Sequence, residues 1–195
     1  MTDLNKDYWE ERYQSASTGW DIGEISTPIR TFVDGLENKS ASILIPGAGN
    51  GHEAIYMHRQ GFTMVRVLDF AKSPLDTLQQ NCPDFPKQHL IQDDFFNHEG
   101  AYDLIIEQTF FCALNPNLRQ AYVEKMHQLI KPGGYLAGLL FGIEMHDAGP
   151  PFGGSIEEYE YLFSPYFNIE KMEPCYNSIS PRKGKELFVI LQNKN

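Results

Sequence analysis

The chain has 195 residues, of which 42% are hydrophobic and 22% are charged, and its formal net charge is −10. This length and composition are typical of one folded domain with its own hydrophobic core and exclude wholesale disorder. The acidic charge argues against a nucleic-acid partner, which needs a basic surface, and against an anionic membrane.

Short apolar runs alternate with helical patterns from residue 42 onward. The runs predict strands at 42–46, 63–69, 89–93, 102–107, 135–141, 167–172 and 187–191. The patterns between them predict helices at 52–60, at 73–81 with Ser73 as N-cap, from Asn115 to the Lys131–Gly134 stop, and at 159–163 after a Ser155/Glu158 capping box.

This alternation predicts an α/β fold with a Rossmann-like, doubly wound and mainly parallel seven-stranded sheet. The last two strands have no helix between them and are expected to form an antiparallel edge pair. We expect one domain over 1–195, with the sheet and helices in 41–195. Residues 1–40 lie outside the alternating pattern, and their aromatic side chains predict a helical lid over the ligand edge of the sheet.

A glycine-rich turn follows the first strand, and an acidic residue ends the second. Gly47, Gly49 and Gly51 allow a sharp turn that approaches a ligand closely, and Asp69 lies 20 residues after Gly49. This spacing suits an acidic side chain that accepts the hydroxyls of a ribose. His52 stands where a dinucleotide fingerprint has its third glycine, which favours a ligand with a ribose and no pyrophosphate. A tight structural loop is the alternative.

Acidic and aromatic residues also follow the third and fourth strands. Asp94 and Phe95 offer a carboxylate to an exocyclic amine and a ring to a base, or else cap a turn and fill the core. Glu107 places a carboxylate at the same edge of the sheet, because ligands bind at the carboxyl ends of parallel strands.

Three other patterns favour structural roles. His52 and His58 lie about 120° apart around a helix, so they do not form a zinc site. Cys112 follows two phenylalanines and is predicted to be a buried thiol. Arg182 belongs to a charged hairpin turn or else grips an anion.

The cysteines are Cys82, Cys112 and Cys175, and none of them belongs to a paired motif. This spacing predicts free thiols, a reducing compartment and no metal site. The charged N-terminus has no apolar signal region, and no apolar run approaches about 18 residues. We therefore expect a cytoplasmic protein. Its expected partner is a small molecule, and its expected oligomeric state is a monomer or a weak homodimer.

Four segments together resemble the thiopurine methyltransferase superfamily of class I S-adenosylmethionine-dependent methyltransferases, and within it the thiol and halide methyltransferases. They are Trp9 with Thr18–Gly23 and Pro28, Ile45–Glu53, Phe110–Leu114, and Gly149–Phe152 with Arg182–Glu186. Two positions depart from plant relatives: Tyr13 replaces a tryptophan and Phe141 replaces a tyrosine.

The resemblance implies that the chain binds S-adenosylmethionine and releases S-adenosylhomocysteine. It assigns nine residues to the cofactor: Trp9, Tyr13 and Trp20 would cover it, and Gly47 and Gly49 would lie under its methionine part. Asp69 would hold the ribose, Asp94 and Phe95 the adenine, and Glu107 would lie near the methionine ammonium. The candidate residues for the methyl acceptor are Phe110, Phe111, His146, Phe152 and Arg182, with His146 as a candidate catalytic base.

The leading hypothesis is methyl transfer to a small soft nucleophile: a thiol, bisulfide or halide. Such acceptors need little acid–base help, so an aromatic pocket can act by positioning them and excluding water. The alternatives are a thiopurine-type aromatic thiol methyltransferase, a nicotinamide-dependent oxidoreductase and a non-catalytic cofactor-binding domain.

Overall fold

A computed structural model of the protein describes residues 4–145 and 149–194. The chain divides into two compact units, residues 1–98 and 99–195. Among the described residues, no helix is long and apolar enough to cross a membrane.

The first unit carries the glycine turn and the acidic strand end. Its elements, in chain order, are α1 (Lys6–Gln14), α2 (Thr27–Asp34), β1 (Ile43–Pro46), α3 (His52–Arg59), β2 (Val65–Asp69), α4 (Lys72–Asn81), the 3₁₀ turn η1 (Lys87–His89) and β3 (Leu90–Gln92). β2 pairs in parallel with both β1 and β3. All four residues of β1 are buried, as expected for a strand in a parallel sheet covered on both faces.

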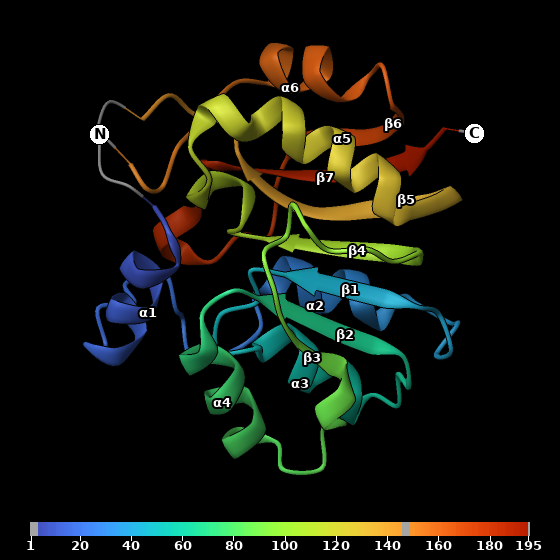
Figure 1. Ribbon diagram of the computed structural model, residues 1–195. Coiled ribbons are helices and arrows are strands. Elements are labelled where there is room, and N and C mark those ends of the chain that lie inside the picture. Colours follow the sequence, from blue (N-terminus) through green and yellow to red (C-terminus); the bar gives the residue numbers. More distant parts are fainter. Residues whose placement is uncertain (1–3, 146–148, 195) are drawn as a thin grey trace. The chain divides into compact units, whose positions relative to one another are not determined.

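The second unit carries the aromatic segments and the antiparallel strands. Its elements, in chain order, are β4 (Tyr102–Gln108), η2 (Phe111–Ala113), η3 (Pro116–Leu118), α5 (Arg119–Leu129), β5 (Ile130–Phe141), α6 (Ile156–Phe163), β6 (Phe167–Pro174), η4 (Ser180–Arg182) and β7 (Glu186–Asn193). β4 and β5 are parallel, whereas β7 is antiparallel to both β5 and β6. Helices α5 and α6 pack against each other (Figure 1).

The strands form a seven-stranded sheet in the order β3-β2-β1-β4-β5-β7-β6. This order confirms the predicted α/β fold with a mainly parallel sheet and an antiparallel C-terminal pair. Only β6 of that pair is an edge strand, because β7 lies between β5 and β6.

The N-terminal segment, predicted as one lid over 1–40, contains two different helices. Helix α1 has no buried side chain. Helix α2 buries Ile29 and Val33 and contacts α3, so it belongs to the core of the first unit. Among the N-terminal helices, only α1 thus has the exposed character expected of a lid.

Two predicted boundaries are wrong. Ser73 is not the N-cap of its helix, because α4 begins at Lys72 and its N-cap is Ala71. The Lys131–Gly134 stop signal does not lie between a helix and a strand, because β5 begins at Ile130 and includes it. Ile130 already pairs with Tyr102 of β4, and that pairing outweighs the turn propensity of the glycines. The Ser155 cap is confirmed, since its side chain accepts the Glu158 N–H at 3.2 Å.

Gly51 precedes α3 with a φ of +74°, and a Cβ there would lie 2.2 Å from Leu78 Cδ1. We expect Gly51→Ala to lower the free energy of unfolding by about 2–4 kcal/mol, because the substitution combines backbone strain with a clash. Urea denaturation measures the loss. Gly61→Ala is the matched control, since Gly61 has a φ of +85° and open space around it. Equal losses in the two variants would show that the approach of Leu78 contributes nothing.

Candidate functional site

The glycine turn after β1 forms a tight loop that brings backbone close to neighbouring groups. Gly47 and Gly49 have φ values of +57° and +53°, which glycine adopts without strain. The Gly47 N–H donates to the Leu68 carbonyl at 2.7 Å, which fixes the turn beside β2. A Cβ on Gly49 would lie 3.4 Å from the Tyr13 hydroxyl. The turn therefore brings its backbone close to both β2 and Tyr13, and its contact with a ligand stays a prediction.

Asp69 ends β2 directly beside this turn. Its carboxylate is buried, with 7% of the residue exposed, and accepts the Ala71 N–H at 2.9 Å. Burial raises the pKa of Asp69 to about 7, although backbone hydrogen bonds from Ala71 and Gly49 oppose the shift. A buried carboxylate makes stronger hydrogen bonds to a hydroxyl donor than an exposed one does, because little water competes for it.

Aromatic side chains of the N-terminal segment gather at the same place. Trp20 makes edge-on contacts with Trp9 and Tyr13, with ring centroids 5.4 and 5.7 Å apart. Burial raises the pKa of Tyr13, and the nearby negative charge of Asp69 raises it further. Five of the predicted cofactor residues thus lie together in the first unit: Trp9, Tyr13, Trp20, Gly49 and Asp69.

Asp21 joins the N-terminal segment to the glycine turn, a contact that the sequence analysis missed. Its carboxylate lies 2.8 Å from His52 Nε2, accepts the Gly23 N–H at 2.7 Å and bonds the Asn50 amide. Burial alone would raise the pKa of Asp21, but these hydrogen bonds hold it below its usual value. Asp21 and His52 both belong to segments that carry the family resemblance, Thr18–Gly23 and Ile45–Glu53, but no local pattern pairs them.

The residues predicted to contact the adenine occupy a turn after β3. Asp94 is exposed, and its carboxylate accepts the Phe96 N–H at 2.9 Å. Phe95 is buried, with 5% exposed, and contacts Phe96. These contacts match the alternative of a capped turn with a core phenylalanine, and adenine binding by this pair stays a prediction.

In the second unit, Glu107 is fully buried at the end of β4. Its carboxylate accepts the N–H groups of Phe110 and Phe111 at 2.8 and 2.9 Å, and the Tyr122 hydroxyl at 2.5 Å. Burial raises the pKa of Glu107 to about 7, against the effect of these hydrogen bonds. Glu107 therefore fixes the turn that carries the two phenylalanines, and its predicted contact with the methionine ammonium stays a prediction.

The two phenylalanines of this turn differ in exposure. Phe111 is 1% exposed and packs against Tyr122 and Tyr159, with ring centroids 4.9 and 5.5 Å apart. Phe110 is partly exposed and lies 6.1 Å from the Tyr122 ring. Phe111 is therefore a core residue and only Phe110 of this pair is partly exposed, and contact of either ring with the acceptor stays a prediction.

The remaining acceptor candidates lie near Cys112. Phe152 donates its N–H to the Cys112 carbonyl at 2.7 Å, which joins the Gly149–Phe152 segment to the turn. The side chain of Arg182 is 11% exposed and lies 3.6 Å from Glu186, so it is not a solvated turn residue. Burial raises the pKa of the Cys112 thiol, as predicted for a buried thiol, and the charge of Arg182 opposes that shift. His146 lies outside the described residues.

One group of three potential metal ligands occurs among residues 4–145 and 149–194. His58 Nε2 lies 3.2 Å from one Asp84 oxygen, and the Cys82 thiol lies 3.3 Å from the other. Hydrogen bonds within the group already account for the arrangement, and His52 is not part of it.

Comparisons with known proteins agree with this architecture. The family model for thiopurine S-methyltransferase matches residues 4–193. A probable thiol methyltransferase 2 from Arabidopsis thaliana is 31% identical over 193 residues, which cover 95% of this chain and 84% of that protein. Thiocyanate methyltransferase 1 from Brassica oleracea is 32% identical over 184 residues, which cover 91% of this chain and 81% of that protein.

The fold is also found among solved structures. The 1,6-didemethyltoxoflavin-N1-methyltransferase of Burkholderia thailandensis, crystallised with S-adenosylhomocysteine, superposes with a TM-score of 0.77 at 16% identity. The match covers 98% of this chain and 88% of that one. These findings confirm the resemblance drawn from the sequence motifs. The chain therefore belongs to the thiopurine S-methyltransferase family of S-adenosylmethionine-dependent methyltransferases.

Proposed function

We propose that this methyltransferase acts on a small soft nucleophile: a thiol, bisulfide, halide or thiocyanate. The observation that carries the proposal is the likeness, at 31% and 32% identity over most of the chain, to a probable thiol methyltransferase and a thiocyanate methyltransferase. We add thiocyanate to the proposed acceptors because one of these relatives is a thiocyanate methyltransferase.

We assign the cofactor to the first unit, whose residues suit an adenosine with free hydroxyls. Asp69 is a buried carboxylate beside Gly49, so it would accept the ribose hydroxyls. The Gly47–Gly49 turn would admit the methionine portion, and the rings of Trp9, Tyr13 and Trp20 would shield the bound molecule from water. When bound, the cofactor supplies an electrophilic methyl group on a sulfonium.

We assign the choice of acceptor to the second unit. Phe110 would offer a partly exposed ring, and the largely buried cation of Arg182 would favour an anionic acceptor. In the transfer, the lone pair of an anionic acceptor would form a bond to the methyl carbon as the sulfonium–methyl bond broke, which would neutralise the negative charge of the acceptor and the positive charge of the sulfonium; a thiol would react as its thiolate. Thiolate, iodide and thiocyanate have no proton to lose, so positioning and exclusion of water would suffice.

A binding experiment followed by an acceptor panel tests the proposal. S-adenosylhomocysteine at a hundredfold excess over its Kd should stabilise the protein by about 2.7 kcal/mol, whereas NADH should not. Labelled methyl transfer should then appear with thiols, bisulfide, iodide or thiocyanate above the enzyme-free rate. Stabilisation by NADH alone would favour the oxidoreductase alternative, and cofactor binding without transfer to any acceptor would favour a non-catalytic domain.

A thiopurine-type aromatic thiol is the second candidate acceptor, because the matching family model bears that name. A kcat/KM for an aromatic thiol that exceeds the values for all small acceptors would replace the leading proposal with this one.

A further inference from the structure

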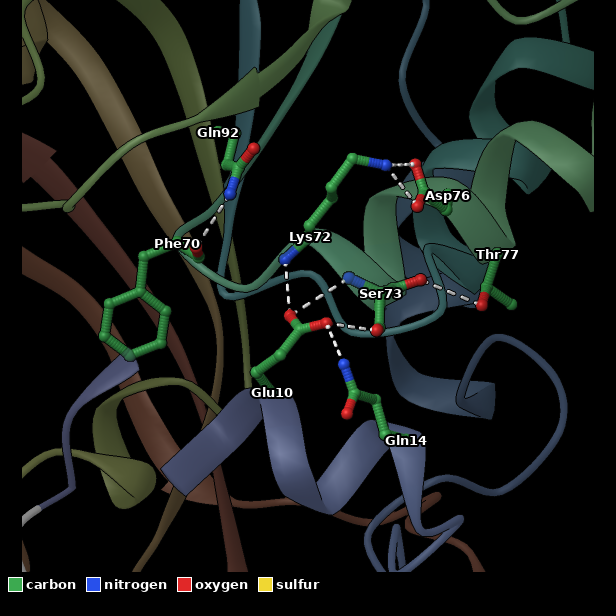
Figure 2. Close-up of polar contacts among 8 residues, drawn as sticks. All are labelled: Glu10, Gln14, Phe70, Lys72, Ser73, Asp76, Thr77 and Gln92. Atoms are coloured by element: carbon green, nitrogen blue, oxygen red, sulfur yellow. Dashed lines mark hydrogen bonds and ion pairs between the residues drawn. The ribbon is translucent and has the colours of Figure 1, made fainter. Parts of the chain in front are cut away.

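The carboxylate of Glu10 fastens helix α1 to the first turn of α4, although the residues are 62 and 63 positions apart (Figure 2). One oxygen accepts the N–H groups of Lys72 and Ser73 at 2.7 and 3.2 Å. The other accepts the Ser73 hydroxyl and the Gln14 amide. We call this set of contacts the Glu10 clasp.

Helix α4 lacks a capping side chain of its own, which explains why this contact forms. Its N-cap is Ala71, which makes no side-chain hydrogen bond, and its first turn contains no acidic residue. The first N–H groups of a helix need acceptors, and the positive end of the helix dipole favours a negative charge. Glu10 supplies both from another helix. The Ser73 hydroxyl, which the sequence suggested as the cap, instead donates to Glu10.

The charge of Glu10 is consistent with this role. The hydroxyl of Ser73 is the main cause that lowers the pKa of Glu10; partial burial opposes it, and the backbone N–H groups of Ser73 and Lys72 lower it further. The group is therefore ionised near neutral pH. A charged acceptor makes stronger hydrogen bonds to N–H groups than a neutral one does.

Helix α1 depends on contacts of this kind, because it buries no side chain in the core. Its rings make further contacts: Trp9 and Tyr13 both meet Trp20, and the Tyr13 hydroxyl approaches Gly49. Trp9 precedes Glu10 and Tyr13 lies one helical turn after it. The position of Tyr13 beside Gly49, and that of Trp9 against Trp20, is thus coupled to the attachment of Glu10 to α4.

We propose that Glu10 is a positioning residue that holds α1 closed and thereby sets how long the cofactor stays bound. The inference rests on the proposed cofactor site of the first unit. It needs no direct contact between Glu10 and the cofactor, because the effect passes through Trp9 and Tyr13.

Tryptophan fluorescence reports specifically on the N-terminal segment, residues 1–40, because the chain has 2 tryptophans and both, Trp9 and Trp20, belong to that segment. Stopped-flow fluorescence would follow the dissociation of S-adenosylhomocysteine from the wild type and from Glu10→Gln. We expect dissociation to be about 5- to 10-fold faster in the variant, less than the loss of a whole charged hydrogen bond would cause, because the glutamine oxygen still accepts an N–H group and the position is partly exposed. In turnover, KM for S-adenosylmethionine should rise while kcat at saturation changes little.

Two further variants distinguish the effect of the Glu10 clasp on ligand dissociation from the effect of a general loss of stability. Glu11→Gln removes an exposed carboxylate from the same helix and should dissociate the ligand at the wild-type rate. Ser73→Ala removes the reciprocal hydroxyl, and its effect should be smaller in the Glu10→Gln background than in the wild type.

Wild-type dissociation rates in Glu10→Gln, or equal effects of Glu10→Gln and Glu11→Gln, would overturn the role of the clasp. A wild-type protein that does not bind S-adenosylhomocysteine would instead overturn the proposed function. The two failures are therefore distinguishable.

Discussion

Asp69→Asn is expected to weaken the binding of S-adenosylhomocysteine by about 100-fold, or about 2.7 kcal/mol, without unfolding the protein. An ionised carboxylate accepts hydrogen bonds from two hydroxyls, whereas an amide offers one acceptor and one donor group. Asp69 is buried beside Gly49, so little water is available to compensate. Isothermal titration calorimetry measures the loss, and an affinity within about threefold of wild type would remove Asp69 from the site.

The pH dependence of the same variant gives an independent check. Burial raises the pKa of Asp69 from 3.8 to about 7, so the folded protein holds an extra proton between those values. That contribution to stability is present at low pH and is lost as the pH rises towards 7. The unfolding free energy of the cofactor-free wild type should therefore fall from about pH 4 to about pH 7, and should fall less steeply in Asp69→Asn.

Cofactor affinity should depend on pH with the opposite sign. Because the ionised carboxylate accepts the ribose hydroxyls, affinity in the wild type should rise as Asp69 ionises and should level off above about pH 7. In Asp69→Asn this rise should be absent. Asp76→Asn is the matched control, since Asp76 is an exposed carboxylate on α4 that pairs with Lys72. If the affinity for the cofactor depended on pH in Asp76→Asn as it does in Asp69→Asn, that result would contradict the assignment of Asp69.

Local patterns were sufficient to predict most of the sheet. The strands ending at Pro46 and Asp69 were recognisable because buried parallel strands are short apolar runs. The Ser155 cap was recognisable because both of its partners lie within one helical turn. The start of β5 was not, since the pairing of Ile130 with Tyr102 comes from a different part of the chain.

The candidate site likewise contains residues that local sequence patterns predict and contacts that they do not. Asp69 and the glycine turn could be predicted, because a sheet presents the carboxyl ends of its strands at a common edge. The contacts of Glu10 with Ser73 and of Asp21 with His52 could not, since they join residues 63 and 31 positions apart. No local periodicity encodes such pairs. The sequence predicted Ser73 as the cap of this helix, whereas the N-cap of α4 is Ala71, which has no capping side chain, and Glu10 supplies the missing acceptor.

Glu107→Ala is expected to lower the free energy of unfolding by about 3–5 kcal/mol, the largest stability effect that we expect in the second unit. The substitution removes the acceptor of the Phe110 N–H, the Phe111 N–H and the Tyr122 hydroxyl and leaves a cavity. Glu107→Gln should cost only about 1 kcal/mol, because its amide oxygen still accepts the two N–H groups. Urea denaturation compares the two variants, and equal losses would show that these hydrogen bonds contribute little.

Glu107→Gln also tests whether the carboxylate binds the cofactor or only supports the turn. Burial raises the pKa of Glu107 from 4.5 to about 7, so its contribution to stability is lost as the pH rises through that range, and the amide should abolish this slope. We expect the variant to bind S-adenosylhomocysteine within about threefold of wild type, because Phe110, Phe111 and Tyr122 already hold both oxygens of the carboxylate. A loss of about tenfold or more at unchanged stability would instead establish the contact with the methionine ammonium that the family resemblance implies.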